Sequence, residues 1–150
     1  EETPRIIDPR NAFIMYDLLK EVIKNGTARK AKTLKRPDFA GKTGTTNDLM
    51  DAWFAGFNSD IVTVTWMGYD QPKSLGNKET GSRAALPIWI DYMRPLLKDY
   101  PIKNLVKPEG IIPYKINKKT GMTNNADENG FYEYFYEEYP PFDNSYFVIN

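Results

Sequence analysis

Three stretches rich in apolar and β-branched residues follow one another in the first half of the chain, joined by very short links. They run from Phe39 to Thr46, from Asp51 to Phe57 and from Ile61 to Tyr69. A parallel connection between neighbouring strands needs a dozen or more residues, so such short links force the strands to be antiparallel. The sequence therefore predicts a three-stranded antiparallel sheet with the 39–46 strand at one side.

The middle stretch is apolar on both of its faces. Side chains alternate along a strand, so Trp53, Ala55 and Phe57 share one face while Ala52 and Phe54 share the other. A strand of this kind belongs in a sheet that is covered on both sides. We therefore expect other segments to pack against each face.

A first helix is predicted before the sheet. It begins at Asp8-Pro9, because Asp is favoured as an N-cap and Pro at the first helical position. It ends at Asn25-Gly26, since both residues accept the left-handed conformation that closes a helix. The expected apolar stripe consists of Met15, Leu18, Leu19 and Val22.

A second helix is predicted after the sheet, beginning near Arg83. Pro87 fits its first turn, whereas Pro95 should bend or end it. Its apolar stripe consists of Leu86, Trp89, Ile90, Met93 and Leu97. This helix should cover one face of the sheet, so the predicted fold class is α/β (α+β), an antiparallel sheet covered by helices.

The character of the chain changes from Tyr100 onward, where prolines separate short apolar pieces. Ile111 to Ile116 is consistent with a strand that turns at residues 118–121. An aromatic and acidic segment at 132–139 suggests an extended tail packed on the domain surface, or else a ligand platform. We therefore divide the chain into residues 1–98 and residues 99–150, the latter an extended tail or small β appendage.

Composition excludes several kinds of chemistry. The chain has no cysteine and no histidine, which removes disulfides, thiol catalysis, Ser-His-Asp mechanisms and histidine-ligated metals. We expect no metal and no cofactor. Equal numbers of basic and acidic residues give no electrostatic case for nucleic acid. No apolar run approaches the roughly 18 residues of a membrane span, and the acidic start without Met suggests a fragment.

The run Gly41-Lys42-Thr43-Gly44-Thr45-Thr46 is the candidate functional site. It carries one cation, three hydroxyls and two glycines on the first predicted strand, and Lys and Thr together can hold an anion. A phosphate loop is excluded, because the position five before Gly41 holds Arg36 and not glycine. An ordinary solvated edge strand remains the plain alternative.

A basic cluster precedes the run and consists of Arg29, Lys30, Lys32, Lys35 and Arg36. Such a cluster is usually a solvated loop. The alternative is a rim that attracts an acidic substrate toward Lys42.

Several ordered blocks resemble the transpeptidase domain of class A penicillin-binding proteins. The first is the segment 36–47, which contains the Lys-Thr-Gly box of that family and of serine β-lactamases. The others are residues 51–56, 66–70 and 84–89. The similarity covers residues 5–98 well and the tail more weakly. It implies that residues 1–98 form the C-terminal portion of a transpeptidase domain.

The resemblance implies acyl transfer on peptidoglycan stem peptides that end in D-Ala-D-Ala, and acylation by β-lactam antibiotics. Lys42 would attract the terminal carboxylate and support proton transfer, and the hydroxyls of Thr43 and Thr45 would bind that carboxylate. The backbone N–H of Thr45 would be one oxyanion-hole donor. Gly44 leaves room for substrate along the strand. Thr46 is counted with Thr43 and Gly44 among the substrate-binding residues.

The chain departs from the family in lacking its nucleophile. None of its four serines, at positions 59, 74, 82 and 145, forms Ser-x-x-Lys or Ser-x-Asn. Both motifs lie upstream of the Lys-Thr-Gly strand in the family, so we expect them in a missing N-terminal part, and we expect this chain alone to be inactive. The parent would also be a glycosyltransferase. It would lie on the periplasmic side of the bacterial envelope, anchored in the cytoplasmic membrane.

Two alternatives stay open. One is a fragment of a serine β-lactamase, although the 51–54 block and the long tail favour a penicillin-binding protein. The other is a non-catalytic module that uses the same sheet to bind a partner.

Overall fold

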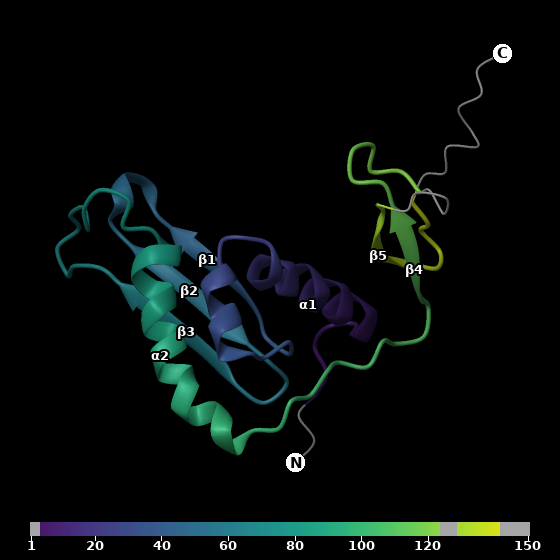
Figure 1. The fold of residues 1–150 in the computed structure, drawn as a ribbon, viewed down its shortest axis with the longest axis horizontal. Helices are drawn as coiled ribbons and strands as arrows, with labels where there is room; N and C mark the ends of the chain where they lie inside the picture. The colour runs from purple at the N-terminus through teal and green to yellow at the C-terminus, as the bar shows by residue number, and fades with distance from the viewer. Residues whose placement is uncertain (1–3, 124–128, 142–150) are drawn as a thin grey trace. The chain divides into compact units, whose positions relative to one another are not determined.

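The computed structural model describes residues 4–123 and 129–141 (Figure 1). The chain divides into two compact units. The larger comprises Met15–Leu105, and the smaller combines Glu1–Ile14 with Val106–Asn150. The division of the chain after residue 98 stays a prediction.

The larger unit is built on a three-stranded antiparallel sheet, as the short links predict. Its strands are β1 (Ala40–Thr45), β2 (Ala52–Phe57) and β3 (Val62–Met67), paired in the order β1-β2-β3. β1 is therefore an edge strand of this sheet. The register pairs Lys42 with Ala55 and Trp53 with Trp66.

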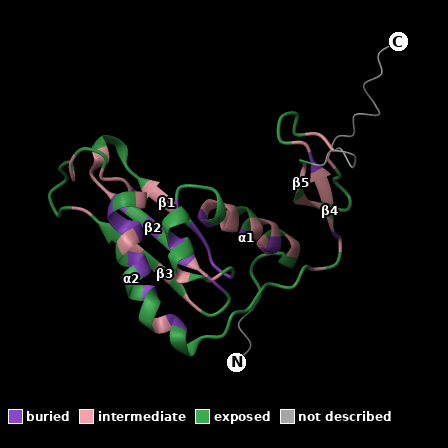
Figure 2. Ribbon diagram, viewed as in Figure 1, coloured by how far each residue is buried: buried purple, intermediate pink, exposed green. Residues whose placement is uncertain are grey.

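One face of the sheet is covered by a helical segment that begins with a single π-helical turn, η3 (Gly81–Ala85). It continues as α2 (Leu86–Leu96) and ends in the 3-10 turn η4 (Leu97–Asp99). All five residues of the predicted stripe are buried, on the helix face drawn in purple in Figure 2. The ring of Trp89 meets those of Phe39 and Phe54 edge-on, at centroid distances of 5.2 and 5.0 Å. Pro95 lies in the last turn of α2, so it marks the end of the helix as predicted.

Most of the opposite face of the sheet is exposed within the part of the chain that the structure describes, although the Phe57 ring at one end lies 6.0 Å from that of Tyr16. Trp53, Val64 and Trp66 keep 41, 56 and 45% of their surface exposed. The expectation that other segments cover both faces is therefore not met by the described residues. An apolar pattern on both faces of a strand indicates that each face is suited to burial. It does not indicate which residues cover each face.

α1 (Pro9–Lys24) has the predicted limits. Asp8 Oδ1 accepts hydrogen bonds from the backbone N–H groups of Arg10 and Asn11, at 2.8 and 3.3 Å, and so caps the helix. The predicted stripe is wrong in part, because Met15 and Leu18 are nearly half exposed. The buried residues of α1 are instead Phe13, Tyr16 and Ile23.

The smaller unit contains an antiparallel hairpin of β4 (Ile111–Ile116) and β5 (Phe131–Tyr136). β4 confirms the strand expected at these residues. The aromatic and acidic segment contributes residues 131–136 to this pairing, so of the two expected forms, an extended tail or a small β appendage, the described residues have the second. Within this unit the rings of Phe13 and Tyr134 pack edge-on with their centroids 5.0 Å apart. Arg10 Nη1 donates a hydrogen bond to Glu138 Oε1 at 2.6 Å.

A buried ion pair stands at the entry to β1. Asp38 is fully buried, and its two carboxylate oxygens accept hydrogen bonds from Nε and Nη2 of Arg36 at 2.8 and 2.6 Å. Asn58 and the Lys103 amide donate further bonds at 3.3 and 3.4 Å. Burial raises the pKa of Asp38, but the bonds from Arg36 and Lys103 outweigh it and hold that pKa below its ordinary value.

We expect Arg36→Met to lower the free energy of unfolding by about 3–5 kcal/mol, because it leaves the Asp38 carboxylate buried without its cation. Urea denaturation followed by tryptophan fluorescence measures the change. Lys24→Met is the matched control: it removes the exposed pair with Glu21 and should cost about 0.5 kcal/mol or less. Equal losses in the two variants would contradict the role given to the buried pair.

The same pair predicts a pH dependence. Because the pKa of Asp38 is lower in the folded than in the unfolded protein, its stabilising effect is complete above the ordinary value near 4. The effect is lost as the pH falls from there through the folded pKa. The stability difference between the wild type and Asp38→Asn should therefore shrink below about pH 4. A difference that stays constant between pH 7 and 3 would refute this prediction.

Candidate active site

β1 presents its side chains alternately to the two faces of the sheet. Lys42 and Gly44 lie on the same face as their partners Ala55 and Trp53, which is the exposed face. The Lys42 side chain is exposed, and its Nζ donates a hydrogen bond to the carbonyl oxygen of Thr43 at 2.9 Å. The ammonium group is therefore held along the strand and remains open to a ligand.

The backbone of β1 also directs hydrogen-bonding groups toward its outer edge. The N–H of Thr46 donates to the carbonyl of Asp51 at 3.1 Å, which makes this pair a hydrogen-bonded one. Bonded and non-bonded pairs alternate in an antiparallel ladder, so Thr45 and Thr43 occupy non-bonded positions. Their N–H and C=O groups point away from β2, toward the open edge.

The hydroxyls of Thr43 and Thr45 are both anchored by neighbouring segments. Thr43 Oγ1 lies 2.7 Å from Thr27 Oγ1, and Thr45 Oγ1 accepts a hydrogen bond from the N–H of Gly81 at 3.0 Å. A hydroxyl that accepts one hydrogen bond keeps its own proton for another acceptor. Thr45, and one member of the Thr43–Thr27 pair, can therefore still donate to an anion.

Thr46 is engaged differently. Its hydroxyl accepts from the Asp51 N–H at 2.8 Å and lies 3.3 Å from the Asp51 carboxylate. These bonds close the link between β1 and β2. Its assignment to the substrate site stays a prediction.

Gly81 lets η3 approach the strand closely, and Gly44 leaves the opposite, exposed face clear beside Trp53. A Cβ added to Gly81 would overlap the carbonyl oxygens of Gly44 and Trp53, and one added to Gly44 would lie 3.2 Å from the Cβ of Trp53. Gly81 and Thr27 are site residues that the sequence analysis did not select. No local motif marks them, because their partners lie 37 and 16 residues away along the chain.

A cavity of about 320 Å³ lies beside Thr27, and its lining is basic. The lining residues are Gly26, Thr27, Arg29, Lys30, Ser82 and Arg83. Two members of the predicted basic cluster, Arg29 and Lys30, therefore lie near the hydroxyl that Thr27 shares with Thr43. This position fits a rim that attracts an anion, although the route of a substrate to Lys42 stays a prediction.

The described residues contain no serine positioned as an activated nucleophile. Ser59 bonds Asp60, Ser74 accepts from the Gly76 N–H, and Ser82 lies 2.9 Å from the Thr80 hydroxyl. None of these bonds involves a lysine, and Ser145 lies outside the described residues. The described part of the chain also contains no cluster of acidic, cysteine or histidine side chains that could hold a metal. No helix in it is long and apolar enough to cross a membrane.

No protein-family model matches the chain. The chain is nevertheless similar to several proteins that share one name. The chain is 51% identical over 144 residues to penicillin-binding protein 1A of Pseudomonas aeruginosa, covering 94% of this chain and 18% of that protein. It is 52% identical over 112 residues to penicillin-binding protein 1A of Neisseria gonorrhoeae, covering 75% and 14% of the two chains. The chain thus spans less than a fifth of these relatives.

The structure is similar to the 2.6 Å crystal structure of penicillin-binding protein 1A from Haemophilus influenzae. The TM-score is 0.86 at 36% sequence identity, covering 95% of this chain and 22% of that one. The predicted fold class, an antiparallel sheet covered by helices with a β-containing tail, is thereby confirmed.

We expect Gly81→Ala to destabilise the protein by about 1–3 kcal/mol, because the added methyl group pushes η3 off the backbone of β1 and β2. The thermal midpoint should fall accordingly. Ser82→Ala, at the next position, removes only a hydroxyl bond to Thr80 and serves as the control. If Gly81→Ala melts at the wild-type temperature, the close contact does not fix the strand.

Proposed function

Because this chain belongs to the penicillin-binding protein 1A family, we propose that it supplies the substrate-binding strand of a peptidoglycan transpeptidase. One observation carries the proposal: Lys42-Thr43-Gly44 stands on an edge strand with an exposed ammonium, backbone groups directed to the open edge and, next to it, the Thr45 hydroxyl, which can still donate. A strand of this kind suits an extended peptide with a terminal carboxylate.

The proposed reaction is acyl transfer between stem peptides. A serine hydroxyl from another part of the parent protein attacks the carbonyl carbon of the penultimate D-Ala. The amide bond breaks, an acyl-serine ester forms, and the nitrogen of the terminal D-Ala takes up the proton lost by the serine. The terminal D-Ala then leaves as the free amino acid. The amine of a second stem then attacks the acyl-serine ester, forms the cross-link and returns the serine. A β-lactam would acylate the same serine.

Each site residue has a role in this proposal. Lys42 attracts the terminal carboxylate by charge, and the Thr43 and Thr45 hydroxyls donate hydrogen bonds to it. The outward N–H of Thr45 stabilises the oxyanion that develops on the attacked carbonyl, a contribution of about 3–4 kcal/mol in comparable acyl transfer. Gly44 keeps the face beside Lys42 free of a side chain.

The surroundings of the reaction follow from the same proposal. The intact protein would supply Ser-x-x-Lys and Ser-x-Asn from residues outside this chain. The chain alone would therefore not be acylated by a stem peptide or a β-lactam. The intact protein would also polymerise glycan strands, and it would act on the outer side of the cytoplasmic membrane.

We expect Lys42→Ala in the intact protein to slow acylation by a fluorescent penicillin about 10- to 150-fold. This range corresponds to the loss of a charge-assisted hydrogen bond of about 1.5–3 kcal/mol. Lys98→Ala, which removes an exposed lysine from η4, is the matched control and should label at the wild-type rate. An unchanged rate in Lys42→Ala would remove the role given to Lys42, and label on a residue of this chain would overturn the proposed division of labour.

A further inference from the structure

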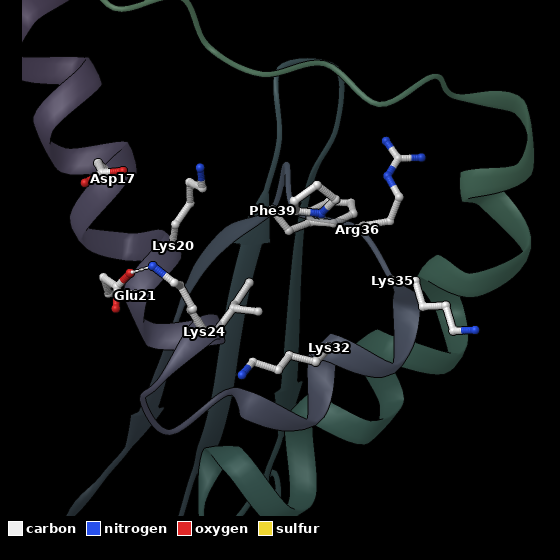
Figure 3. Close-up of a pocket in the computed structure, with 10 residues that line it drawn as sticks. Asp17, Lys20, Glu21, Lys24, Lys32, Lys35, Arg36 and Phe39 are labelled. Atoms are coloured by element: carbon white, nitrogen blue, oxygen red, sulfur yellow. Dashed lines mark hydrogen bonds and ion pairs between the residues drawn. The ribbon is translucent and has the colours of Figure 1, made fainter. Parts of the chain in front are cut away.

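A second cavity, separate from the β1 edge, lies in the larger unit between the second half of α1 and the segment that leads to β1. Its volume is about 440 Å³, within the range of small-molecule sites. It is lined from one side by α1 and from the other by residues 32–39, which include part of the 3-10 helix η1 (Arg29–Leu34) (Figure 3). None of the residues from Lys42 to Thr46 lines it.

The apolar part of the lining is firmly held. Ile23 and Phe39 are only 6 and 3% exposed, and Pro37 adjoins them in the lining. The Phe39 ring is fixed from behind by Trp89, whose ring meets it at 88°. The lining therefore includes a small preformed apolar surface, beside which the Arg36 guanidinium stands 5.9 Å from the centre of the Phe39 ring.

The lining has more positive than negative charge. Five cationic side chains and two carboxylates contribute to it: Asp17, Lys20, Glu21, Lys24, Lys32, Lys35 and Arg36. The guanidinium of Arg36 is committed to Asp38, and Lys24 bonds Glu21 at 2.8 Å. This leaves Lys20, Lys32 and Lys35 against the single carboxylate of Asp17.

The three remaining lysines extend in different directions from the lining. Across residues 4–123 and 129–141, no carboxylate forms an ion pair with Lys20, Lys32 or Lys35. Lys20 stands on α1, with its Nζ 5.5 Å from the centre of the Tyr16 ring. In Figure 3 Lys32 extends from η1 toward the side of the cavity where α1 lies, whereas Lys35 extends away.

We propose that this cavity is a binding site for a small anion with an apolar body, such as an aryl or short acyl phosphate or carboxylate. The anionic group lies between Lys20 and Lys32, and the apolar body lies on Ile23 and Phe39. Neither the lysines nor the apolar lining would bind such a ligand tightly without the other. The lysines alone would hold a bare anion weakly in water, and the apolar lining alone would leave their charge uncompensated.

The test is calorimetric titration of the intact protein with 2-naphthyl phosphate, inorganic phosphate and 2-naphthol. We expect 2-naphthyl phosphate to bind at least about tenfold more tightly than either of the others, since each lacks one half of the interaction. Equal affinity for inorganic phosphate would overturn the apolar half of the proposal. Equal affinity for 2-naphthol would overturn the ionic half, and no binding of 2-naphthyl phosphate at millimolar concentration would overturn both.

Variants locate the site. Lys32→Met and Lys20→Met should each weaken binding of 2-naphthyl phosphate about tenfold, while unchanged circular dichroism shows that the fold persists. Lys30→Met is the matched control, because Lys30 belongs to the same 3-10 helix as Lys32 but does not line this cavity. Unchanged affinity in both Lys20→Met and Lys32→Met, or an equal loss in Lys30→Met, would refute the assignment.

Discussion

The buried ion pair between Arg36 and Asp38 is the interaction on which the position of β1 depends. Burying two charges costs several kcal/mol each, so such a pair persists only where further hydrogen bonds complete it. Here Arg36 also donates to the carbonyls of Tyr100 and Pro101 at 2.7 and 3.0 Å, just after the end of η4. The Tyr16 hydroxyl donates to the backbone carbonyl of Asp38 at 2.7 Å. The Arg36 side chain and the Asp38 backbone thus connect the segment after η4 and α1 to the point two residues before β1.

The far end of β1 is fixed by a contact of a different kind, the close approach of η3 to the strand backbone. A Cβ at Gly81 would overlap the carbonyl oxygens of Gly44 and Trp53, and the Gly81 N–H donates a hydrogen bond to the Thr45 hydroxyl. Between the two ends, Gly56 has no space for a Cβ, which would lie 2.5 Å from the Trp89 ring. An ion pair at one end and glycine contacts at the other therefore hold β1 rigidly, as a preorganised site requires.

The sequence predicted those parts of the fold that local patterns determine. The stripe of α2 was identified correctly because its apolar residues occupy one narrow face, and the strands followed from short links. α1 has apolar residues over a wider arc, and the contact between Tyr16 and Asp38, 22 residues apart, selects the buried side. β5 pairs with β4 across a long connection, so no short turn motif in the sequence predicts this pairing. In the site the sequence identified the Lys-Thr-Gly run, but Thr27 and Gly81 reach it only through the folded chain.

The arrangement of β1 also separates two kinds of site residue. The hydroxyls of Thr43 and Thr45 each make a bond to another segment and so support the fold, while Thr45 and one member of the Thr43–Thr27 pair can still donate to a ligand. A substitution at either position would therefore mix a loss of stability with a loss of binding. Among the described residues, Lys42 bonds the carbonyl of its own neighbour alone, and it lies on the exposed face, opposite to the core around Phe54 and Trp89. Its charge can be removed without disturbing that core, which makes it the residue whose contribution to ligand binding can be read most directly.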